Sequence, residues 1–442
     1  MAIQVPVITN LTKGFKPEEC VTFQGKSLRG VSRAFGKSMS EVTKAYLKWA
    51  LRGNNLRTRR LILNDAQDRL HHLEELAGSG VLVVDKVNWL RRYLEAFYGY
   101  CEGAGLTLAE GAFLQVVIDG GCQTLWVRDT KTGEIRLVHT EEDEDSLSLS
   151  LKDGKYGYKL VEMSERGKTI RFFAYPGFCG WGATFGFNQT TGLIQTADDL
   201  IVKEGFNKGV LWASAVGFMA LDCGNLETIE KLFQKIESLP GMKFTGGYSI
   251  HFAQSGNPPL MRSVEFGGDK VRWLDPDKVR NRLIIAQTNC PLDPDIQPFA
   301  EASPPPKGEF WGRAGAQLYV EMRERQLRLT TIGATVDWLK KNMDDTIKIG
   351  LEILADPYMD VGKSVGGQGR DSFYYTGLPS SWTVAHLVAY IGRDEISFYV
   401  GKLTPKPIKG REYALKFRKN YKFTGKELWK LAERERRIFF KQ

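Results

Sequence analysis

The chain passes from a helical to an extended pattern in a stretch that begins Tyr93-Leu-Glu-Ala-Phe-Tyr-Gly-Tyr-Cys-Glu-Gly-Ala-Gly-Leu106 and ends Asp119-Gly-Gly-Cys122. Apolar residues recur at three- and four-residue spacing over 86–101, which predicts a helix that ends at the glycine-rich turn 103–105. Residues 107–110, Thr-Leu-Ala-Glu, resemble a capping box, so a further helix is expected to run to about Ile118. A helical pattern over 38–78 precedes both, and residues 1–35 are expected to form an extended arm. Residues 1–121 are therefore predicted to be mostly helical.

Extended patterns dominate the sequence after Cys122. Apolar segments at 125–127 and 134–139 flank a polar loop, 129–133, which ends in glycine, and this arrangement predicts a hairpin. Further strands are expected at 158–162, 169–175, 183–188, 192–197, 248–253, 261–266, 282–288, 382–391 and 395–402. Helical patterns cover 208–223, 226–238, 315–345 and 346–356. Runs of strands separated by helices predict an α+β fold with helices outside the sheets.

Composition and charge limit the class of protein. The chain has 442 residues, of which 42% are hydrophobic and 26% are charged, so it can bury a sizeable core. The net charge of +9 is uneven, because residues 402–442 contain 14 Lys and Arg against 4 Asp and Glu, and the remainder contains 47 against 48. We interpret this basic tail as a solvated segment with an amphipathic helix over 425–441; the alternative is a tail that contacts phosphates, acidic lipid surfaces or an acidic patch on its own body. The rest of the chain has no basic stripe, so no nucleic-acid partner is expected.

Cysteine spacing and the N-terminal sequence indicate a soluble protein of a reducing compartment, which we expect to be the cytoplasm. The six cysteines are widely spaced and include no C-x-x-C pair, so neither a disulfide framework nor a zinc site is predicted. Residues 1–12 lack the layout of a signal peptide, and the longest nearly apolar stretch, 209–221, is too short to span a bilayer. Three Gly-Lys-Ser triplets lack the glycine that a phosphate-binding loop needs five positions earlier. No membrane partner, metal or cofactor is therefore expected.

Five landmarks extend from residue 93 to about residue 330. The first is the helix, turn, helix and Gly121-Cys122 stretch described above. The others, in order, are His139-Thr-Glu-Glu-Asp143, Pro176-Gly-Phe-Cys-Gly-Trp-Gly182 with Gly186-Phe-Asn188 and Thr191-Gly-Leu193, Gln287-Thr-Asn289, and Glu324-Arg325-Gln-Leu-Arg328-Leu329. In this order they resemble the penicillin acyltransferase family of N-terminal nucleophile hydrolases, which includes isopenicillin-N acyltransferase and β-alanyl-amine hydrolases. Each landmark is weak alone, and together they are specific.

The resemblance implies a four-layer αββα sandwich, in which two antiparallel sheets pack face to face with helices outside. It implies that residues 1–121 are a prosegment, which stays bound as the α chain of a heterodimer after the Gly121–Cys122 bond is cut. Residues 122–442 would form the β chain, with the basic tail 402–442 at its end. The enzyme would be an amidohydrolase or acyltransferase that forms an acyl-enzyme on Cys122. Its substrate would be a small molecule with a non-peptide or isopeptide amide.

The chemistry of a cysteine that follows a glycine explains the expected self-cleavage. The thiol can attack the preceding carbonyl and form a thioester by an N-to-S acyl shift, and water then hydrolyses the thioester. Gly121 lacks a β-carbon and so tolerates the strained geometry of this attack. The α-amine released on Cys122 has an ordinary pKa of about 8, low enough to serve as the base for the thiol near neutral pH.

The resemblance also assigns roles to residues outside the cleavage site. Asp143 would hold the Cys122 amine. The carboxylate with this role could also lie one or two positions from Asp143, since the acidic run also contains Glu141, Glu142, Glu144 and Asp145. Asn289 would donate to the oxyanion of the tetrahedral intermediate, together with a backbone N–H. Arg325 would bridge Asp143 and the nucleophile.

Asn188 and His139 are further candidates, and the sequence departs from the family pattern in places. Asn188 is a candidate substrate contact or second oxyanion donor, with a turn residue as the alternative. His139 is a candidate general acid, with a packed strand residue as the alternative. Gln123 stands where the family usually has Thr or Ser, Cys290 replaces a His, and Met322 replaces a Ser. Three alternatives stay open: transfer from acyl-CoA to an amine, an inactive binding member of the fold, and a nucleic-acid-binding module built on the tail.

Overall fold

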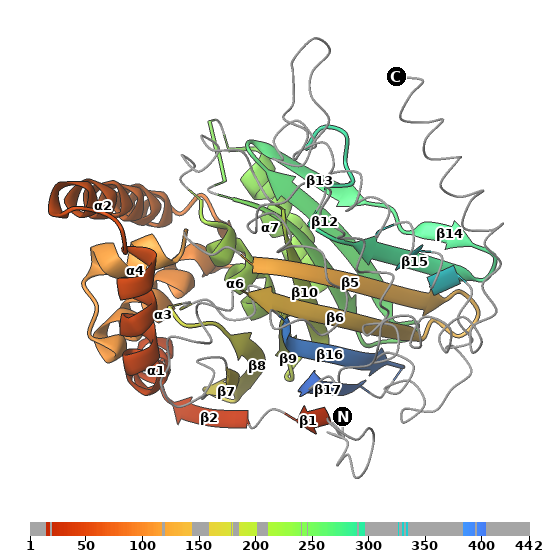
Figure 1. Cartoon of the computed structure of the whole chain (residues 1–442). Helices are drawn as coiled ribbons and strands as arrows, with labels where there is room; N and C mark the ends of the chain where they lie inside the picture. Colours follow the sequence, from red (N-terminus) through yellow and green to blue (C-terminus); the bar gives the residue numbers. More distant parts are fainter. Residues whose placement is uncertain are drawn as a thin grey trace, which may run out of the picture.

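The computed structural model of the chain places helices beside two large β-sheets (Figure 1). It describes residues 15–17, 20–116, 120–143, 159–177, 179, 185–200, 211–239, 241–244, 246–289, 291–296, 326, 329–330, 333–334, 383–393 and 396–403. Most of the helices predicted over 315–345 and 346–356, and the basic tail beyond residue 403, lie outside the described residues.

The N-terminal part of the chain is mostly helical, as predicted. Its helices are α1 (Leu28–Ala50), α2 (Leu56–Ser79), α3 (Trp89–Ala104) and α4 (Leu108–Leu114), with a small hairpin of β3 (Val83–Val84) and β4 (Val87–Asn88) before α3. The prediction of an extended arm over residues 1–35 is wrong for its last residues, which belong to α1. Ser27 caps α1 by accepting the Gly30 N–H, so the helix begins at Leu28.

Local capping fixes the ends of α3 and α4. Gly105 has a φ of 68°, a left-handed conformation that glycine adopts without strain, and it ends α3 at Ala104. The predicted capping box is confirmed, because Thr107 Oγ1 accepts the Glu110 N–H while the Glu110 carboxylate accepts the Thr107 N–H. α4 ends at Leu114, earlier than predicted.

Three glycines, among them Gly36, let α1 and α3 lie backbone against backbone. A β-carbon at Gly103 would lie 2.0 Å from the Arg33 carbonyl oxygen, and one at Gly99 would lie 2.2 Å from that of Arg29. Both separations are far below van der Waals contact. A side chain at either position would therefore force the two helices apart.

Seven of the described strands form one sheet, in the order β1-β17-β16-β6-β5-β15-β14. Their bounds are β1 (Phe15–Pro17), β5 (Gly120–Asp129), β6 (Ile135–Asp143), β14 (Asp277–Val279), β15 (Arg282–Gln287), β16 (Thr383–Ile391) and β17 (Ile396–Leu403). All neighbouring strands are antiparallel. The predicted hairpin is confirmed as β5 and β6, and the two predicted strands near the C-terminus are β16 and β17.

Eight described strands form the second sheet, in the order β13-β12-β11-β10-β9-β8-β7-β2. Their bounds are β2 (Cys20–Gly25), β7 (Lys159–Glu165), β8 (Lys168–Ala174), β9 (Phe185–Asn188), β10 (Leu193–Leu200), β11 (Gly247–Gln254), β12 (Leu260–Gly267) and β13 (Lys270–Leu274). The pair of β2 and β7 is parallel and the other pairs are antiparallel. β13 and β14 were not predicted, because both are short and mostly half-exposed or exposed.

The two sheets pack face to face and helices cover the outer face of the eight-stranded one. One apolar cluster joins the inward side chains of both sheets, among them Trp126 and Leu137 from one and Phe187 and Ile194 from the other. A second, larger cluster joins the other face of the eight-stranded sheet to α1, α3, α6 (Ala213–Cys223) and α7 (Leu226–Glu237). The predicted α+β fold with helices outside sheets is confirmed in this form.

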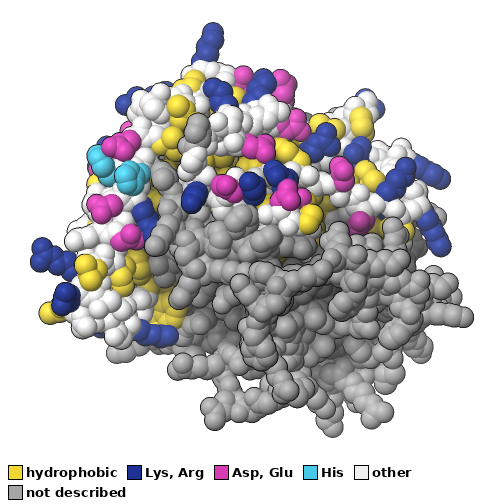
Figure 2. All heavy atoms as spheres, turned by 90° about the horizontal axis from the view of Figure 1, so that it is seen from above, with side chains coloured by type: hydrophobic (Ala, Val, Ile, Leu, Met, Phe, Trp, Pro, Cys, Tyr) yellow, Lys and Arg dark blue, Asp and Glu magenta, His cyan; other side chains and the backbone are white. Residues whose placement is uncertain are grey.

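Surface charge is mixed over the part of the molecule that the structure describes. Figure 2 shows Lys and Arg side chains interspersed with Asp and Glu side chains on one face. This mixture agrees with the nearly equal numbers of basic and acidic residues before the tail. Among the described residues, no helix combines the length and the apolar character that a membrane span requires.

Candidate active site

Cys122 lies near the start of β5, on the face that points into the interior between the sheets. Side chains alternate along a strand, so Cys122, Thr124 and Trp126 share this face, and Trp126 belongs to the apolar cluster there. Cys122 is directly opposite Glu141 of β6, and only 2% of the cysteine is exposed. Because β5 begins at Gly120, the Gly121–Cys122 bond lies inside the strand.

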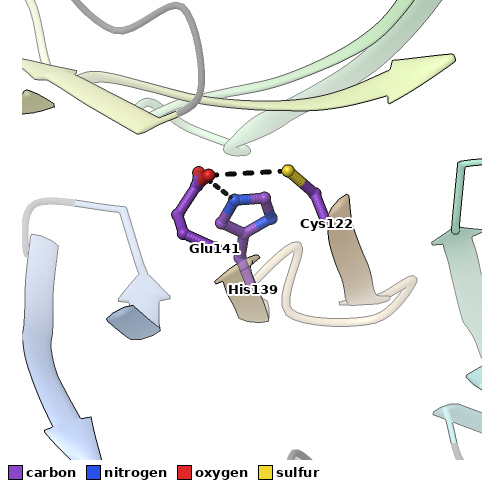
Figure 3. A group of neighbouring side chains, drawn as sticks. All are labelled: Cys122, His139 and Glu141. Carbon is purple, nitrogen blue, oxygen red and sulfur yellow. Dashed lines mark hydrogen bonds and ion pairs between the residues drawn. The ribbon is translucent and has the colours of Figure 1, made fainter. Parts of the chain in front are cut away.

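A buried carboxylate faces the Cys122 thiol (Figure 3). Cys122 Sγ donates to Glu141 Oε2 at 3.5 Å, and Tyr175 Oη donates to the same oxygen at 2.6 Å. The other oxygen, Glu141 Oε1, lies 2.6 Å from His139 Nε2. A buried carboxylate is tolerated only when such partners replace water, and Glu141 has them on both oxygens.

Asn289 fixes the backbone nitrogen of Cys122. The Cys122 N–H donates to Asn289 Oδ1 at 3.4 Å, and Asn289 Nδ2 donates to the Asp199 carbonyl oxygen at 2.7 Å. Exchanging the amide oxygen and nitrogen would set donor against donor and acceptor against acceptor, so the two partners determine the orientation. In the intact chain, Asn289 therefore holds the nitrogen that cleavage would release.

Hydrogen bonds continue from His139 into the opposite sheet. His139 Nδ1 lies 2.7 Å from Thr124 Oγ1, which donates to Asp198 Oδ2 at 2.6 Å. The same carboxylate oxygen lies 3.1 Å from His251 Nε2. These four residues are fully buried, and with Glu141 they form what we call the buried polar row. Thr124, His139 and Glu141 come from the seven-stranded sheet, whereas Asp198 and His251 come from the eight-stranded one.

The environment of Cys122 keeps its thiol protonated. Burial raises the pKa of the thiol well above its ordinary value, and the negative charges of Glu141, Asp198 and Asp199 raise the pKa further. A hydrogen bond from the Asp199 backbone acts in the opposite direction and is the weakest of these influences. The thiol therefore needs a nearby base before it can attack a carbonyl.

The structure brings only some of the predicted residues to Cys122. Asn289, His139 and Glu141 surround it, and the Glu141 position is one of the carboxylates that the sequence left open. The Asp143 backbone pairs with Gly120, but its side chain lies outside the described part of the chain. Arg325 also lies outside it.

Asn188 points away from the cysteine. Its neighbour in β9, Phe187, faces the other sheet, so Asn188 faces the helices. Asn188 Nδ2 donates to the Leu221 carbonyl oxygen at 2.9 Å, which satisfies a backbone acceptor near the C-terminus of α6. The Asn188 side chain therefore joins β9 to α6, on the face of its sheet that points away from the interior in which Cys122 lies.

One group of described residues could share a metal ion, because its donor atoms lie within 4.8 Å of one another. The group consists of Cys122, His139 and Glu141. Such a set would leave a fourth position open, as in catalytic zinc sites. The His139 nitrogen and the Glu141 oxygen, however, lie 2.6 Å apart, whereas two such ligands on one tetrahedral zinc lie roughly 3.3 Å apart. The two groups are hydrogen-bonded to each other, and an ion would have to separate them.

The sequence does contain a pattern that could have indicated the site residues that were not predicted, such as Asp198. Inward positions of β6 run from Ile135 and Leu137 to His139 and Glu141, and those of β10 run from Ile194 through Thr196 to Asp198 before Leu200. A strand whose buried face turns from apolar to charged marks a polar site, because uncompensated burial of charge is unfavourable. No protein-family model matches the chain, and no curated protein matches it. Function is therefore inferred from the site itself.

Proposed function

We propose that the protein is a cysteine amide hydrolase or acyltransferase of the N-terminal nucleophile type. It cuts its own Gly121–Cys122 bond and then forms an acyl-enzyme on Cys122 with a small-molecule amide substrate. One observation carries the proposal: the sulfur and the backbone nitrogen of a buried cysteine are each held by a polar side chain. Glu141 Oε2 lies 3.5 Å from the sulfur, and Asn289 Oδ1 lies 3.4 Å from the nitrogen.

The layering supports a four-layer αββα sandwich around this site. Two sheets face each other, and helices cover the outer face of the eight-stranded sheet. On the outer face of the seven-stranded sheet, a β-carbon at Gly333 would lie 3.0 Å from side-chain atoms of Leu125 and Ile284. Gln326, seven residues before Gly333 and also helical, donates from Nε2 to the Ala286 carbonyl oxygen of β15 at 2.8 Å. We take these contacts as part of a fourth, helical layer.

The mechanism uses the same atoms twice. During self-cleavage the Cys122 sulfur attacks the Gly121 carbonyl carbon, and the carbon–nitrogen bond then breaks to leave a thioester, which water hydrolyses. During turnover the released Cys122 amine acts as the base for the thiol, and Asn289 holds that amine. Asn289 thus has the role of holding the amine that the sequence analysis gave to Asp143, and Glu141 is the carboxylate that contacts the sulfur. Asn289 Nδ2 carries a second N–H, which would serve the oxyanion.

The two fragments would remain together as a heterodimer. α1 and α3 contribute Phe35 and Tyr93 to the same apolar cluster as Phe172 and Ile250 of the eight-stranded sheet. β2 also supplies an edge strand to that sheet by pairing with β7. Separating residues 1–121 from the rest would expose these fully buried side chains, each of which contributes about 1.5–3 kcal/mol by its burial.

The intact mass of the purified protein tests the proposal. We expect two masses, which correspond to residues 1–121 and 122–442, and a single uncut mass for Cys122→Ala. Cys101→Ala is the matched control, since Cys101 is equally buried but lies in the helical layer, and this variant should be cut normally. A wild-type chain that stays intact on prolonged incubation would contradict the proposal.

Hydrolysis and transfer are distinguished on the cleaved protein. A cysteine-directed acylating probe should label Cys122 at the new N-terminus. Release of a free acid from simple amides indicates hydrolysis, whereas consumption of acyl-CoA that depends on an added amine indicates transfer. Failure of the probe to label Cys122 in cleaved protein would instead favour a binding protein that retains the fold.

A further inference from the structure

We propose that the buried polar row is a proton relay for self-cleavage, the step at which Cys122 has no amine of its own. This inference rests on the proposed function. In the intact chain the Cys122 nitrogen is an amide whose N–H donates to Asn289 Oδ1, and an amide nitrogen cannot serve as a base. Cleavage therefore needs a different base from turnover, and Glu141 is the carboxylate in contact with the thiol.

The hydrogen-bond pattern fixes the tautomer of His139. Thr124 has a single hydroxyl proton, and the 2.6 Å contact to the Asp198 carboxylate takes it. Thr124 Oγ1 must then accept a hydrogen bond from His139 Nδ1, which lies 2.7 Å away. His139 therefore carries a proton on Nδ1, and Nε2 faces Glu141.

One proton must lie between His139 and Glu141. Without it, a nitrogen lone pair would face a carboxylate oxygen at 2.6 Å in a fully buried setting, which is strongly repulsive. The pair thus holds one proton that can move in either direction, and Asp198 stabilises it through Thr124. His251, bonded to Asp198 at Nε2 and 2.7 Å from Ser263 Oγ at Nδ1, closes the far end of the row.

This arrangement lets the pair accept one proton and return another. The thiol proton passes to Glu141 as the sulfur–carbon bond forms and the carbonyl electrons move to oxygen. When the tetrahedral intermediate collapses, the carbon–nitrogen bond breaks and the pair gives a proton to the departing Cys122 nitrogen. The products are a thioester and a free amine. The His139–Glu141 pair ends with the single proton it began with, so the step needs no external reagent.

Thr124 is a positioning residue in this scheme, since it contacts neither the sulfur nor the scissile bond in the contacts above. Its hydroxyl holds the Nδ1 proton of His139 and connects the imidazole to Asp198. Thr196 offers a matched control on the facing strand. Its buried hydroxyl also joins the two sheets, because it accepts the Trp126 Nε1–H at 3.1 Å, and it lies outside the row.

The test follows cleavage of pulse-labelled full-length chains made by cell-free translation. We expect Thr124→Val to slow cleavage by about 10–100-fold, whereas Thr124→Ser and Thr196→Val should stay within about threefold of wild type. Serine restores the hydroxyl, so its rescue separates proton handling from packing. Hydroxylamine, which cleaves thioesters, should not restore the rate of Thr124→Val, because the relay acts before the thioester forms.

The outcomes distinguish this inference from the function on which it rests. If wild type is cut and Thr124→Val is cut as fast as Thr196→Val, the relay is wrong and the proposed function stands. If hydroxylamine restores Thr124→Val to the wild-type rate, the row serves thioester hydrolysis and the relay is also wrong. A wild-type chain that is never cut would overturn both proposals.

Discussion

The interior between the two sheets is apolar at one end and polar at the other, although the same strands run through both. In β6 the inward residues Ile135 and Leu137 give way to His139 and Glu141 within four positions. β10 changes in the same direction, from Ile194 to Asp198, and β11 and β12 add His251 and Ser263 to the polar end. Both ends are closed to solvent, so the difference is one of chemistry and not of exposure.

The comparison separates the residues that hold the fold from those that perform the chemistry under the proposed function. Burying an aliphatic or aromatic side chain contributes about 1.5–3 kcal/mol, so the apolar end stabilises the sandwich directly. A buried polar group costs free energy unless it is hydrogen-bonded, so at the polar end each group depends on its partner. Under the proposed function, the buried polar row beside the Cys122 thiol serves the chemistry and not the stability of the fold. The two ends should therefore respond differently to substitution.

The largest effect is expected at the polar end, from Glu141→Gln. The amide cannot accept the thiol proton, so self-cleavage should slow by about 10²–10⁴-fold. The measurement is the rate at which the full-length mass disappears. Asp143→Asn is the matched control, because Asp143 lies two positions along the same strand. If Asp143→Asn were slow and Glu141→Gln fast, the sequence-based choice of carboxylate would be right and ours wrong.

At the apolar end, Leu137→Ala should lower the free energy of unfolding by about 2–5 kcal/mol, because it leaves a cavity among fully buried side chains. Chemical denaturation of cleavage-blocked Cys122→Ala protein, with and without the second substitution, measures the loss. In protein that retains Cys122, the folded Leu137→Ala molecules should still cleave the Gly121–Cys122 bond at close to the wild-type rate. A large loss of cleavage rate without a loss of stability would erase the distinction between the two ends.

The helical layer extends the apolar side of the comparison. Gly103→Ala would bring a β-carbon to 2.0 Å from the Arg33 carbonyl oxygen, so α1 and α3 must separate, at a cost of about 1–3 kcal/mol. Gly78→Ala is the control, since a β-carbon at Gly78 in α2 meets no atom within 4 Å and should stabilise the helix by about 0.5–1 kcal/mol. Equal effects of the two substitutions on thermal unfolding would contradict the close contact of α1 and α3.

Much of the fold follows from local patterns. Periods of 3.6 and 2 located most helices and strands, and the Thr107 capping box is one side-chain pair predicted in detail. The choice between Glu141 and Asp143 was also within reach of the sequence. Asp129 N donates to the Glu134 carbonyl oxygen at 2.9 Å and closes the predicted hairpin. Counting outward from that pair along both strands leads to Cys122 opposite Glu141.

The other half of the site depends on how the sheets stack. Asp198, which also contacts His251, reaches Thr124 only because β10 lies across from β5. No local period encodes that juxtaposition, since it depends on the packing of apolar residues distant in sequence. For a related reason, the sequence could not show which face of its sheet Asn188 occupies. A strand pattern gives alternation, but the face that meets the helices is fixed only by tertiary packing.

Tyr175 lies on the boundary between the two ends, and its substitution should have the smallest effect. Its ring packs edge-on against Phe173 in the apolar cluster, with centroids 5.6 Å apart, while its hydroxyl donates to Glu141. Tyr175→Phe keeps the ring and removes the hydroxyl, so the free energy of unfolding should fall by only about 1 kcal/mol. Cleavage should change by less than in Glu141→Gln, because His139 still holds the carboxylate.

Tyr100→Phe removes a comparable buried hydroxyl, bonded to Thr43 in the helical layer, and should alter stability alone. If Tyr175→Phe and Tyr100→Phe changed stability equally but only the first altered cleavage, the Tyr175 ring would belong to the apolar end and its hydroxyl to the polar end.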